Sequence, residues 1–253
     1  MSDFYTDFAR LFEENGLGEF VSRETSEKFE LLARKLEETN EKFNLTAITD
    51  REGIIIKHFA DSVFPSGQLA EGADVIDVGA GAGFPSLPLA VVRPDLRITS
   101  LDSTAKKLGF VAEAARELGL NNVTTLISRA EDAGRSAEHR EKYDAVISRA
   151  VAALPVLSEL CLPLVKKKGL FIAMKGPSAF DEAKEAESVI TLLGGDKAAF
   201  ADYTLKNGGA NENRILVLVT KKQFTPTKYP RNYSQIAKAA KKAKYEDARR
   251  RFT

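Results

Sequence analysis

The sequence predicts an α/β protein in which a mostly parallel β-sheet follows an N-terminal helical region. Apolar residues recur at helical spacing up to residue 70, whereas beyond Gly72 short runs rich in β-branched residues alternate with helical stretches. Strands and helices that alternate in this way form a parallel sheet covered by helices on both faces. We therefore expect a helical region at residues 1–70, a ligand-binding α/β domain at 71–222 and a basic tail at 223–253.

The N-terminal region is expected to contain three helices. The apolar faces of the first two consist of Phe4, Phe8, Leu11 and Phe12, and of Phe29, Leu32, Leu36 and Phe43. The first helix should end at Gly16 and Gly18. Thr49 and Glu52 have the spacing of a capping box ahead of the third helix, which should stop near Pro65.

Five apolar runs beyond Gly72 predict parallel strands, and two more predict an antiparallel hairpin at the edge of the sheet. The seven runs are residues 74–78, 97–101, 123–127, 144–148, 170–174, 200–205 and 214–220. The last two flank the segment KNGGANEN, whose glycines and asparagines favour a hairpin loop. The helices expected between the strands include residues 104–118, 154–162 and 180–192.

Composition and charge restrict the classes of function. The hydrophobic fraction of 43% is ordinary for a globular protein, and no apolar run approaches the ~20 residues that span a bilayer. The N-terminus lacks the features of a signal peptide, and a single cysteine, Cys161, fits a reducing compartment, so we expect a cytosolic protein. Residues 221–253 carry a charge of +9 and the rest of the chain −8. The basic tail is either a site for a polyanionic partner or a solvated terminus.

The most informative motif is DVGAGAGF at residues 77–84, directly after the first predicted strand. Gly79, Gly81 and Gly83 allow a sharp turn and a close approach to a ligand, because glycine has no Cβ. Ligands of such sheets bind at the carboxyl ends of the strands, where N–H groups of the next helix are free. The glycines run G-x-G-x-G after the acid Asp77, and not G-x-G-x-x-G as in dinucleotide-binding proteins. This pattern is typical of proteins that bind S-adenosylmethionine (SAM); the alternative is a glycine-rich turn without a ligand.

Two further positions fit a SAM site. Asp102 closes the second predicted strand, where a carboxylate accepts hydrogen bonds from both hydroxyls of a ribose. Its alternative role is to cap the next helix together with Ser103 and Thr104; we favour ribose binding. After the third strand, Ala130 and Glu131 are placed to frame an adenine, although an acid in the position of Glu131 is commonly just exposed.

The segment SRAVAALP, residues 148–155, follows the fourth predicted strand. Many methyltransferases that modify exocyclic amines carry an N/D-P-P-Y-like motif here, which holds a nitrogen that must lose a proton. This chain has Arg149 instead, which favours an acceptor atom with a free lone pair. Guanine N7 is such an atom. Its methylation needs no general base and depends on proximity, alignment and the exclusion of water.

The order and spacing of these motifs resemble those of the bacterial small-subunit ribosomal RNA guanine-N7 methyltransferases, the RsmG or GidB family. The motifs are NLTAI (44–48), KHFADS (57–62), VIDVGAGAGFPSLPLAVVRP (75–94), SLDS (100–103), SRAED (128–132), VISRA (146–150), AMKG (173–176), RILVLVTK and KYPR. Family members often stop soon after KYPR-like residues. This chain continues through QIAKAAKKAKYEDARRRFT, to which we assign no catalytic part.

The resemblance implies a Rossmann-like SAM-dependent methyltransferase with a seven-stranded, mostly parallel sheet and an antiparallel edge strand. It also implies a SAM pocket formed by Gly79, Phe84, Ala130, Glu131 and Arg149, with Asp102 as a further contact. The substrate that it implies is one guanine of small-subunit rRNA, either free or in an assembling small subunit.

Four cations follow predicted strands or open them near the expected site: Arg129, Arg149, Lys175 and Arg214. We expect them to form a cationic rim that holds phosphates and donates to guanine O6, and we assign substrate positioning to Arg129 and Arg214. Each has the alternative of a surface ion pair.

The histidines are expected to be structural. His58 should pack against the core with Asp61 and Ser62 as polar partners, and His139 should be solvated. Two scattered histidines and one cysteine lack the spacing of metal ligands, so we expect no metal site.

Other functions compete with rRNA methylation. A SAM-dependent enzyme could act on a small molecule or a protein, and a non-catalytic module could bind SAM or RNA without turnover. A nicotinamide dehydrogenase is disfavoured by the glycine spacing. The sequence leaves the oligomeric state open.

Overall fold

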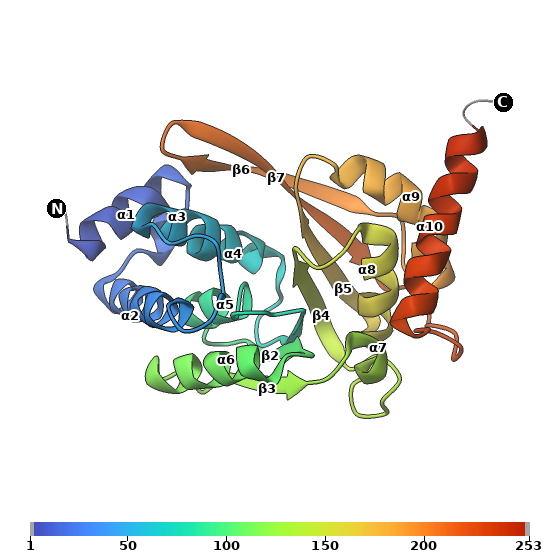
Figure 1. Cartoon of the computed structure of the whole chain (residues 1–253), viewed down its shortest axis with the longest axis horizontal. Helices are drawn as coiled ribbons and strands as arrows, with labels where there is room; N and C mark the ends of the chain where they lie inside the picture. The colour runs from blue at the N-terminus through green and yellow to red at the C-terminus, as the bar shows by residue number, and fades with distance from the viewer. Residues whose placement is uncertain (1–2, 251–253) are drawn as a thin grey trace.

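The computed structural model describes the backbone of residues 3–250 and the side chains of residues 3–242. The strands are β1 (Asp74–Val78), β2 (Arg97–Asp102), β3 (Val123–Ile127), β4 (Tyr143–Arg149), β5 (Val165–Lys175), β6 (Ala199–Asn207) and β7 (Ala210–Thr220). They form one sheet in the order β3-β2-β1-β4-β5-β7-β6, and helices cover both of its faces (Figure 1). Neighbouring strands from β1 to β5 are parallel, and β7 is antiparallel to β5 and β6. The expected α/β sheet with an antiparallel edge is confirmed.

Some of the helices precede β1, others connect successive strands from β1 to β6, and one follows β7. They are α1 (Phe4–Glu14), α2 (Arg23–Asn40), α3 (Arg51–Gly53), α4 (Asp61–Val63), α5 (Ser86–Val92), α6 (Ala105–Glu117), α7 (Ala130–Ala133), α8 (Leu154–Cys161), α9 (Ala179–Leu192) and α10 (Tyr233–Arg250). The helical segments of other types are η1 (Gly18–Phe20), η2 (Ile54–Ala60), η3 (Phe64–Gln68) and η4 (Leu162–Leu164).

The second helix ends earlier than its apolar spacing predicts. α2 stops at Asn40, whose side-chain oxygen accepts the backbone N–H groups of Leu45 and Thr46 at 2.7 and 3.0 Å. These bonds replace the next helical turn. Phe43 therefore lies outside the helix, where the Lys106 ammonium stands 3.9 Å from the centre of its ring.

The third helix is capped by Asp50, so the capping box expected at Thr49 and Glu52 is wrong. Asp50 Oδ2 accepts the backbone N–H of Gly53 at 2.7 Å, and the Glu52 carboxylate forms an ion pair with Arg10 instead. From this cap α3, η2, α4 and η3 follow one another without a break. η2 is a π-helical turn, a wider conformation that is frequent at functional sites.

Two apolar clusters hold the sheet between its helices. One joins the N-terminal helices, α5 and α6 to one face, with Phe8, Phe29 and Phe59 at its centre. The other joins α8, α9 and Ile236 of α10 to the opposite face. The N-terminal helices thus share a core with the sheet. The division of the chain at residues 70 and 222 stays a prediction.

The edge hairpin is longer than its apolar runs suggest. β6 and β7 remain paired as far as Asn207 and Ala210, so the turn consists only of Gly208 and Gly209. Both glycines have positive φ, +55° and +88°, which a two-residue hairpin turn requires. Polar residues of the segment KNGGANEN therefore lie in strands and not in a loop.

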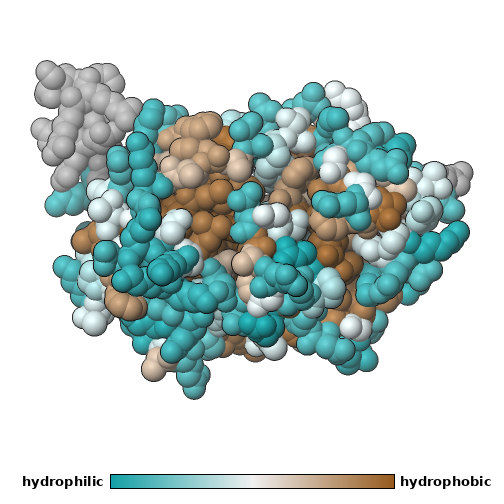
Figure 2. Space-filling view, turned by 180° about the vertical axis from the view of Figure 1, so that it is seen from behind, coloured by the Kyte–Doolittle hydropathy of each residue, from teal (hydrophilic) through white to brown (hydrophobic). Residues whose placement is uncertain are grey.

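The surface seen from behind is mostly hydrophilic, with apolar side chains visible in patches between the polar ones (Figure 2). Within the described part of the chain, no helix is long and apolar enough to cross a membrane.

Candidate active site

The glycine loop after β1 has the conformation that its sequence predicts. Gly79, Gly81 and Gly83 all have positive φ, +78°, +56° and +84°. A Cβ on Gly79 would lie 2.4 Å from Val151 Cγ2, and one on Gly83 would lie 2.6 Å from Leu87 Cδ1. A Cβ on Gly81 would instead point into open space, with no atom nearer than 3.9 Å. The protein itself therefore excludes side chains at the first and third glycines, while the second faces a free volume.

Asp102 holds this loop from the end of β2. Its Oδ2 accepts the backbone N–H of Gly81 at 3.1 Å, and its Oδ1 accepts that of Thr104 at 2.8 Å, where Thr104 is the N-cap of α6. The carboxylate is half-buried and has about four lone-pair positions, so two remain for further donors. Asp102 can therefore hold the first turn of α6 and bind a ribose at the same time.

Asp77 has an unpaired buried oxygen beneath the same loop. Its Oδ2 accepts the N–H and the hydroxyl of Ser86, at 3.2 and 2.6 Å, but its Oδ1 has no hydrogen-bond partner among the described residues. Burial raises the pKa of Asp77 to about 6. A buried carboxylate oxygen without a donor favours a cationic ligand nearby.

These groups fit SAM. Its ribose offers two hydroxyl donors for Asp102, and it carries positive charge that suits the environment of Asp77. The free volume at Gly81 lies where the carboxyl ends of β1 and β4 meet, at the point where the strand order reverses, which is where open α/β sheets bind ligands.

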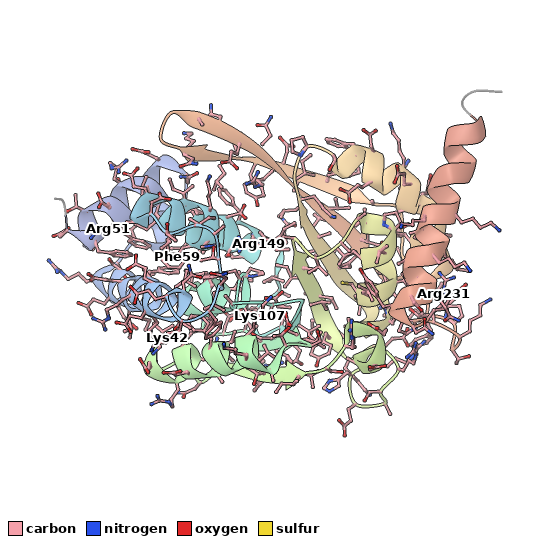
Figure 3. The ribbon with its side chains drawn as sticks, in the orientation of Figure 1. Lys42, Arg51, Phe59, Lys107, Arg149 and Arg231 are labelled. Carbon is pink, nitrogen blue, oxygen red and sulfur yellow. The ribbon has the colours of Figure 1, made fainter. Side chains whose placement is uncertain are left out.

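Arg149 ends β4 on the other side of the loop, near the middle of the molecule between the N-terminal helices and the sheet (Figure 3). Its Nη1 donates to the Lys57 carbonyl at 2.8 Å and to Asp61 Oδ2 at 3.0 Å. Its guanidinium stands 5.7 Å from the centre of the Phe84 ring. Arg149 and Phe84, both predicted SAM-pocket residues, are thus brought together. Ala150 follows with φ of +56°, a conformation that is uncommon outside glycine and often found at functional sites.

Asp61 is the centre of a buried network that the sequence did not identify. In addition to Arg149, it accepts the Tyr203 hydroxyl at 2.8 Å and lies 3.5 Å from Arg214 Nε. Its side chain is only 8% exposed, so these donors replace water. Burial and the neighbouring carboxylate raise the pKa of Tyr203 far above its usual value, which keeps the hydroxyl protonated as a donor.

A cavity of about 420 Å³ opens beside this network. It lies between the π-helical segment, the end of β4, the end of β5 and the β6–β7 hairpin. Its lining residues are Ile48, Lys57, His58, Asp61, Arg149, Ala150, Met174, Lys175, Gly176, Tyr203 and Arg214. Arginine and lysine side chains make it rich in hydrogen-bond donors.

His58 packs against Phe84 as a neutral ring. The two rings are stacked with centroids 4.5 Å apart, and burial followed by the Arg149 charge lowers the pKa of His58 to about 3. Arginine only donates, so Nδ1 faces Arg149 as an acceptor and Nε2 donates to Thr46 Oγ1 at 2.8 Å. The packing of His58 is confirmed. Of its two expected polar partners, Ser62 donates to the backbone carbonyl of His58, whereas the carboxylate of Asp61 bonds to Arg149 and Tyr203 instead.

The neutral state of His58 predicts a dependence of stability on pH. Between pH 6.5 and about 3 the unfolded chain binds a proton at His58 that the folded chain does not, so the stability of the fold should decrease as the pH falls. The slope from this group approaches about 1.4 kcal/mol per pH unit. We expect the free energy of unfolding in urea to drop more for the wild type than for His58→Gln between pH 7 and pH 5. Parallel curves for the two proteins would contradict the neutral assignment.

The other predicted cations have different surroundings. Lys175 Nζ donates to the Ala152 carbonyl and to Glu182 Oε2, at 2.6 and 2.8 Å. Arg214 pairs with Glu212 as well as with Asp61. Arg129 is exposed at the start of α7, and no side-chain partner for it occurs in the part of the chain that the structure describes.

Ala130 and Glu131 open α7 after β3, and both are buried, at 9% and 7% exposure. The interpretation of Glu131 as an exposed acid is therefore wrong, because the short helix turns its side chain inward. Their assignment to an adenine site stays a prediction.

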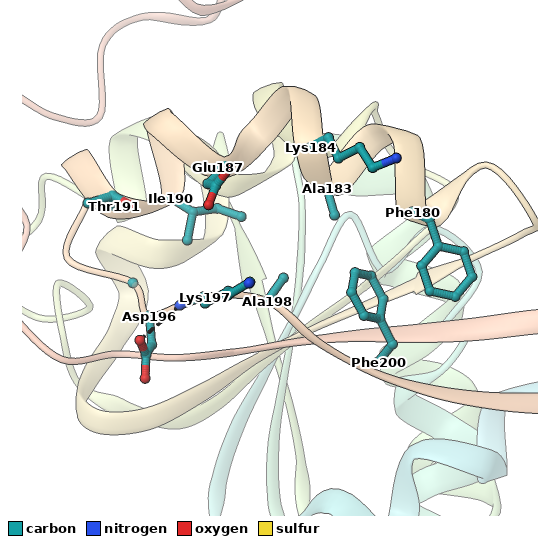
Figure 4. Close-up of a pocket in the computed structure, with 11 residues that line it drawn as sticks. Phe180, Ala183, Lys184, Glu187, Ile190, Thr191, Asp196, Lys197, Ala198 and Phe200 are labelled. Carbon is teal, nitrogen blue, oxygen red and sulfur yellow. Dashed lines mark hydrogen bonds between the residues drawn. The ribbon is translucent and has the colours of Figure 1, made fainter.

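A larger hollow of about 550 Å³ lies elsewhere, between α9 and the edge strand β6 (Figure 4). Phe180 and Phe200 form its apolar end, with ring centroids 4.6 Å apart. Glu187 and Asp196 balance the charges of its two lysines, Lys184 and Lys197. This hollow has neither the glycine loop nor Arg149. Among the described residues, no group of acids, histidines and cysteine has the arrangement of a metal site.

The fold and this site define a SAM-dependent methyltransferase of the Rossmann-like class. Solved structures support the fold: an O-methyltransferase from Bacillus cereus in complex with SAH has a TM-score of 0.51 at 16% identity, covering 75% of this chain and 90% of that one. The YcgJ protein from Bacillus subtilis has a TM-score of 0.50 at 14% identity, covering 66% and 100%.

The family model described as rRNA small subunit methyltransferase G (GidB) matches residues 25–209. Proteins named "Ribosomal RNA small subunit methyltransferase G" are similar along most of the chain. The one from Halalkalibacterium halodurans is 45% identical over 89% of this chain and 94% of its own length, and the one from Deinococcus radiodurans is 47% identical over 81% of each. The chain belongs to the rRNA small subunit methyltransferase G family.

Proposed function

We propose that this protein transfers the methyl group of SAM to N7 of a guanine in small-subunit rRNA, in the cytoplasm. The observation that carries the choice of atom is the state of the titratable groups around the 420 Å³ cavity. His58 is neutral and hydrogen-bonded, Asp61 accepts from Arg149 and Tyr203 and is ion-paired with Arg214, and Tyr203 keeps its proton. None of these is available as a general base, which suits an acceptor that carries no proton.

When bound, SAM supplies an electrophilic methyl group on a positively charged sulfur. N7 of guanine would offer its lone pair to that carbon while the electrons of the C–S bond stayed on sulfur, so no residue of this chain would have to accept a proton. Lys57, Arg149 and Arg214 line the cavity as donors that suit the neighbouring O6 acceptor. The residues of this chain thus act by orienting the base and excluding water.

The target guanine should lie in a loop or be splayed out of a helix. In duplex RNA, N7 lies in a deep and narrow groove that side chains do not reach. The stacked rings of His58 and Phe84 and the donors around Asp61 form a compact site for a single base.

The direct test is to map N7-methylguanosine in small-subunit rRNA from cells with and without the gene. We expect one methylated guanine to disappear with the gene and to return when purified protein and SAM are added to the unmodified rRNA. If the modification pattern is the same in both cells, rRNA is not the substrate. Transfer to metabolites or proteins but not to rRNA would then favour the alternative acceptors.

Arg129 is expected to hold a phosphate at the edge of the site, because it is exposed and its charge is not paired within the described residues. Arg129→Glu should raise KM for rRNA on the order of tenfold at physiological salt and leave the Kd for SAM unchanged. Arg116→Glu is the matched control, since Arg116 is exposed in the last turn of α6. Steady-state methylation at several rRNA concentrations measures both variants, and equal KM values would exclude this role.

A further inference from the structure

The basic tail folds into a helix whose contacts with the body are narrow. α10 packs on α8. Its first turns bury Ile236 and partly bury Ala237 and Ala240, whereas Lys238 and Lys241 are exposed. Six lysines and arginines and two acids lie within Tyr233–Arg250, so the helix carries a charge of +4.

The segment that leads into α10 is fixed by charged groups with buried partners. The Arg231 guanidinium donates to both oxygens of Glu159, at 2.9 and 2.6 Å, and Glu159 is fully buried. Arg140 donates to the Thr225 and Tyr229 carbonyls, each at 2.7 Å, and Arg135 donates to the Pro230 carbonyl at 2.9 Å. Glu159 is the buried charge among these groups, so breaking its bonds to Arg231 would leave it unpaired. The bonds of Arg140 and Arg135 to the carbonyls hold the same segment at further points.

The contacts of Arg231, Arg140 and Arg135 with the segment before α10 set the direction of that helix. The helix starts next to the Arg231–Glu159 pair, and Glu159 lies in the second half of α8. From there α10 runs past the beginning of α8, toward the end of the sheet where β4 ends (Figure 1). Eighteen residues of α-helix measure about 27 Å. The carboxyl ends of the parallel strands, where Arg149 and the glycine loop lie, are at this same end of the sheet.

The cations of the candidate site itself are largely neutralised. Lys57 pairs with Glu212, Arg149 with Asp61, and Lys175 with Glu182. A body with a charge of −8 and paired site cations provides little attraction for a polyanion, so a strong contact with RNA phosphates needs a further basic surface.

We propose that α10 is a basic arm that binds the phosphate backbone of rRNA beside the target loop; this inference rests on the proposed function. The arm adds affinity and leaves the chemical step to the site around Arg149. Its apolar side chains Ile236 and Ala240 already pack against the body, and Tyr233 is the one large apolar side chain that the described turns leave exposed. One such side chain does not form an apolar face that could enter a membrane or a protein groove. Lys238, Lys241 and Lys242 are the exposed cations on those turns.

The test compares two triple variants of the full chain with the same change in charge. The arm variant is K238Q/K241Q/K242Q. The control is K142Q/K167Q/K168Q, which changes exposed lysines near the amino ends of β4 and β5. The Kd for protein-free small-subunit rRNA is measured over a salt series. We expect the slope of log Kd against log salt to fall by about 2 in the arm variant, at roughly 0.7 per lost phosphate contact, and to stay near the wild-type value in the control.

The remaining readouts separate the alternatives. We expect kcat at saturating rRNA and the Kd for SAM to be the same in all three proteins. If the two variants have equal salt slopes and the wild type still methylates rRNA, the proposal that α10 binds rRNA is wrong but the proposed function is not. The arm would also be overturned if its variant bound intact small subunits more weakly but protein-free rRNA equally well. The same holds if the variant lost binding to anionic vesicles alone. If the wild type methylates no guanine of the rRNA, the proposed function fails instead.

Discussion

Replacing Gly81 by alanine should weaken SAM binding by about 5- to 150-fold while the protein stays folded. A Cβ at this position meets no protein atom within 3.9 Å, so the substitution fills only the free volume beside the loop. A methyl group placed in the space of a bound ligand costs about 1–3 kcal/mol, which corresponds to this change in Kd. Isothermal titration with SAM measures it.

Gly119→Ala is the matched control for this substitution. Gly119 also has positive φ, +67°, and a Cβ there meets nothing within 4 Å, but it follows α6 and is remote from the glycine loop. Both alanines should therefore lower the stability by a similar amount, about 1 kcal/mol, because both force a side chain into left-handed backbone. Only Gly81→Ala should lose affinity for SAM. Unchanged affinity in both variants would mean that the ligand does not occupy the space at Gly81.

The elements that could be predicted from sequence are those whose cause is local. The strands after Gly72 are short β-branched runs bounded by glycine and polar residues, and each of them formed a strand. The glycine loop was predictable for the same reason, because positive φ at Gly79 and Gly83 is a property of a few neighbouring residues. Where the expectation was wrong, a single side chain decided the outcome. Asn40 ended a helix by bonding to two backbone N–H groups, which apolar spacing does not reveal.

The part of the site that could not be predicted consists of contacts between distant residues. Asp61 meets Arg149 and Tyr203, which are 88 and 142 positions away in the sequence. The motif KHFADS marked this segment in the sequence. From the motif alone, however, only residues adjacent to Asp61 in the sequence could be suggested as its partners. The three residues come together because the end of β4 and the middle of β6 lie against the same helical segment, η2 and α4. Pairing across a sheet is not a local property.

Asp61→Ala is expected to have the largest effect on both stability and turnover. The substitution leaves Arg149, Arg214 and the Tyr203 hydroxyl around the cavity without their shared acceptor. Removing one partner of a buried ion pair costs about 3–5 kcal/mol, which for a chain of this size lowers Tm on the order of 10 °C. Arg149 also loses the contact that fixes its side chain, and a misplacement of about 1 Å near the reacting groups reduces kcat/KM roughly 100-fold.

Two further variants separate positioning from folding. Asp74→Ala removes an exposed ion pair with Arg97, 45% and 62% exposed, and should cost less than about 1 kcal/mol with no change in turnover. Asp61→Asn keeps the volume and one oxygen for Tyr203 but not the charge, so its kcat should lie between those of Asp61→Ala and the wild type. All are assayed at 25 °C, where circular dichroism must show the folded state. If folded Asp61→Ala had the kcat of the wild type, the Asp61 carboxylate would contribute to the stability of the fold but not to catalysis. A group that orients Arg149 for catalysis cannot be removed without slowing the transfer.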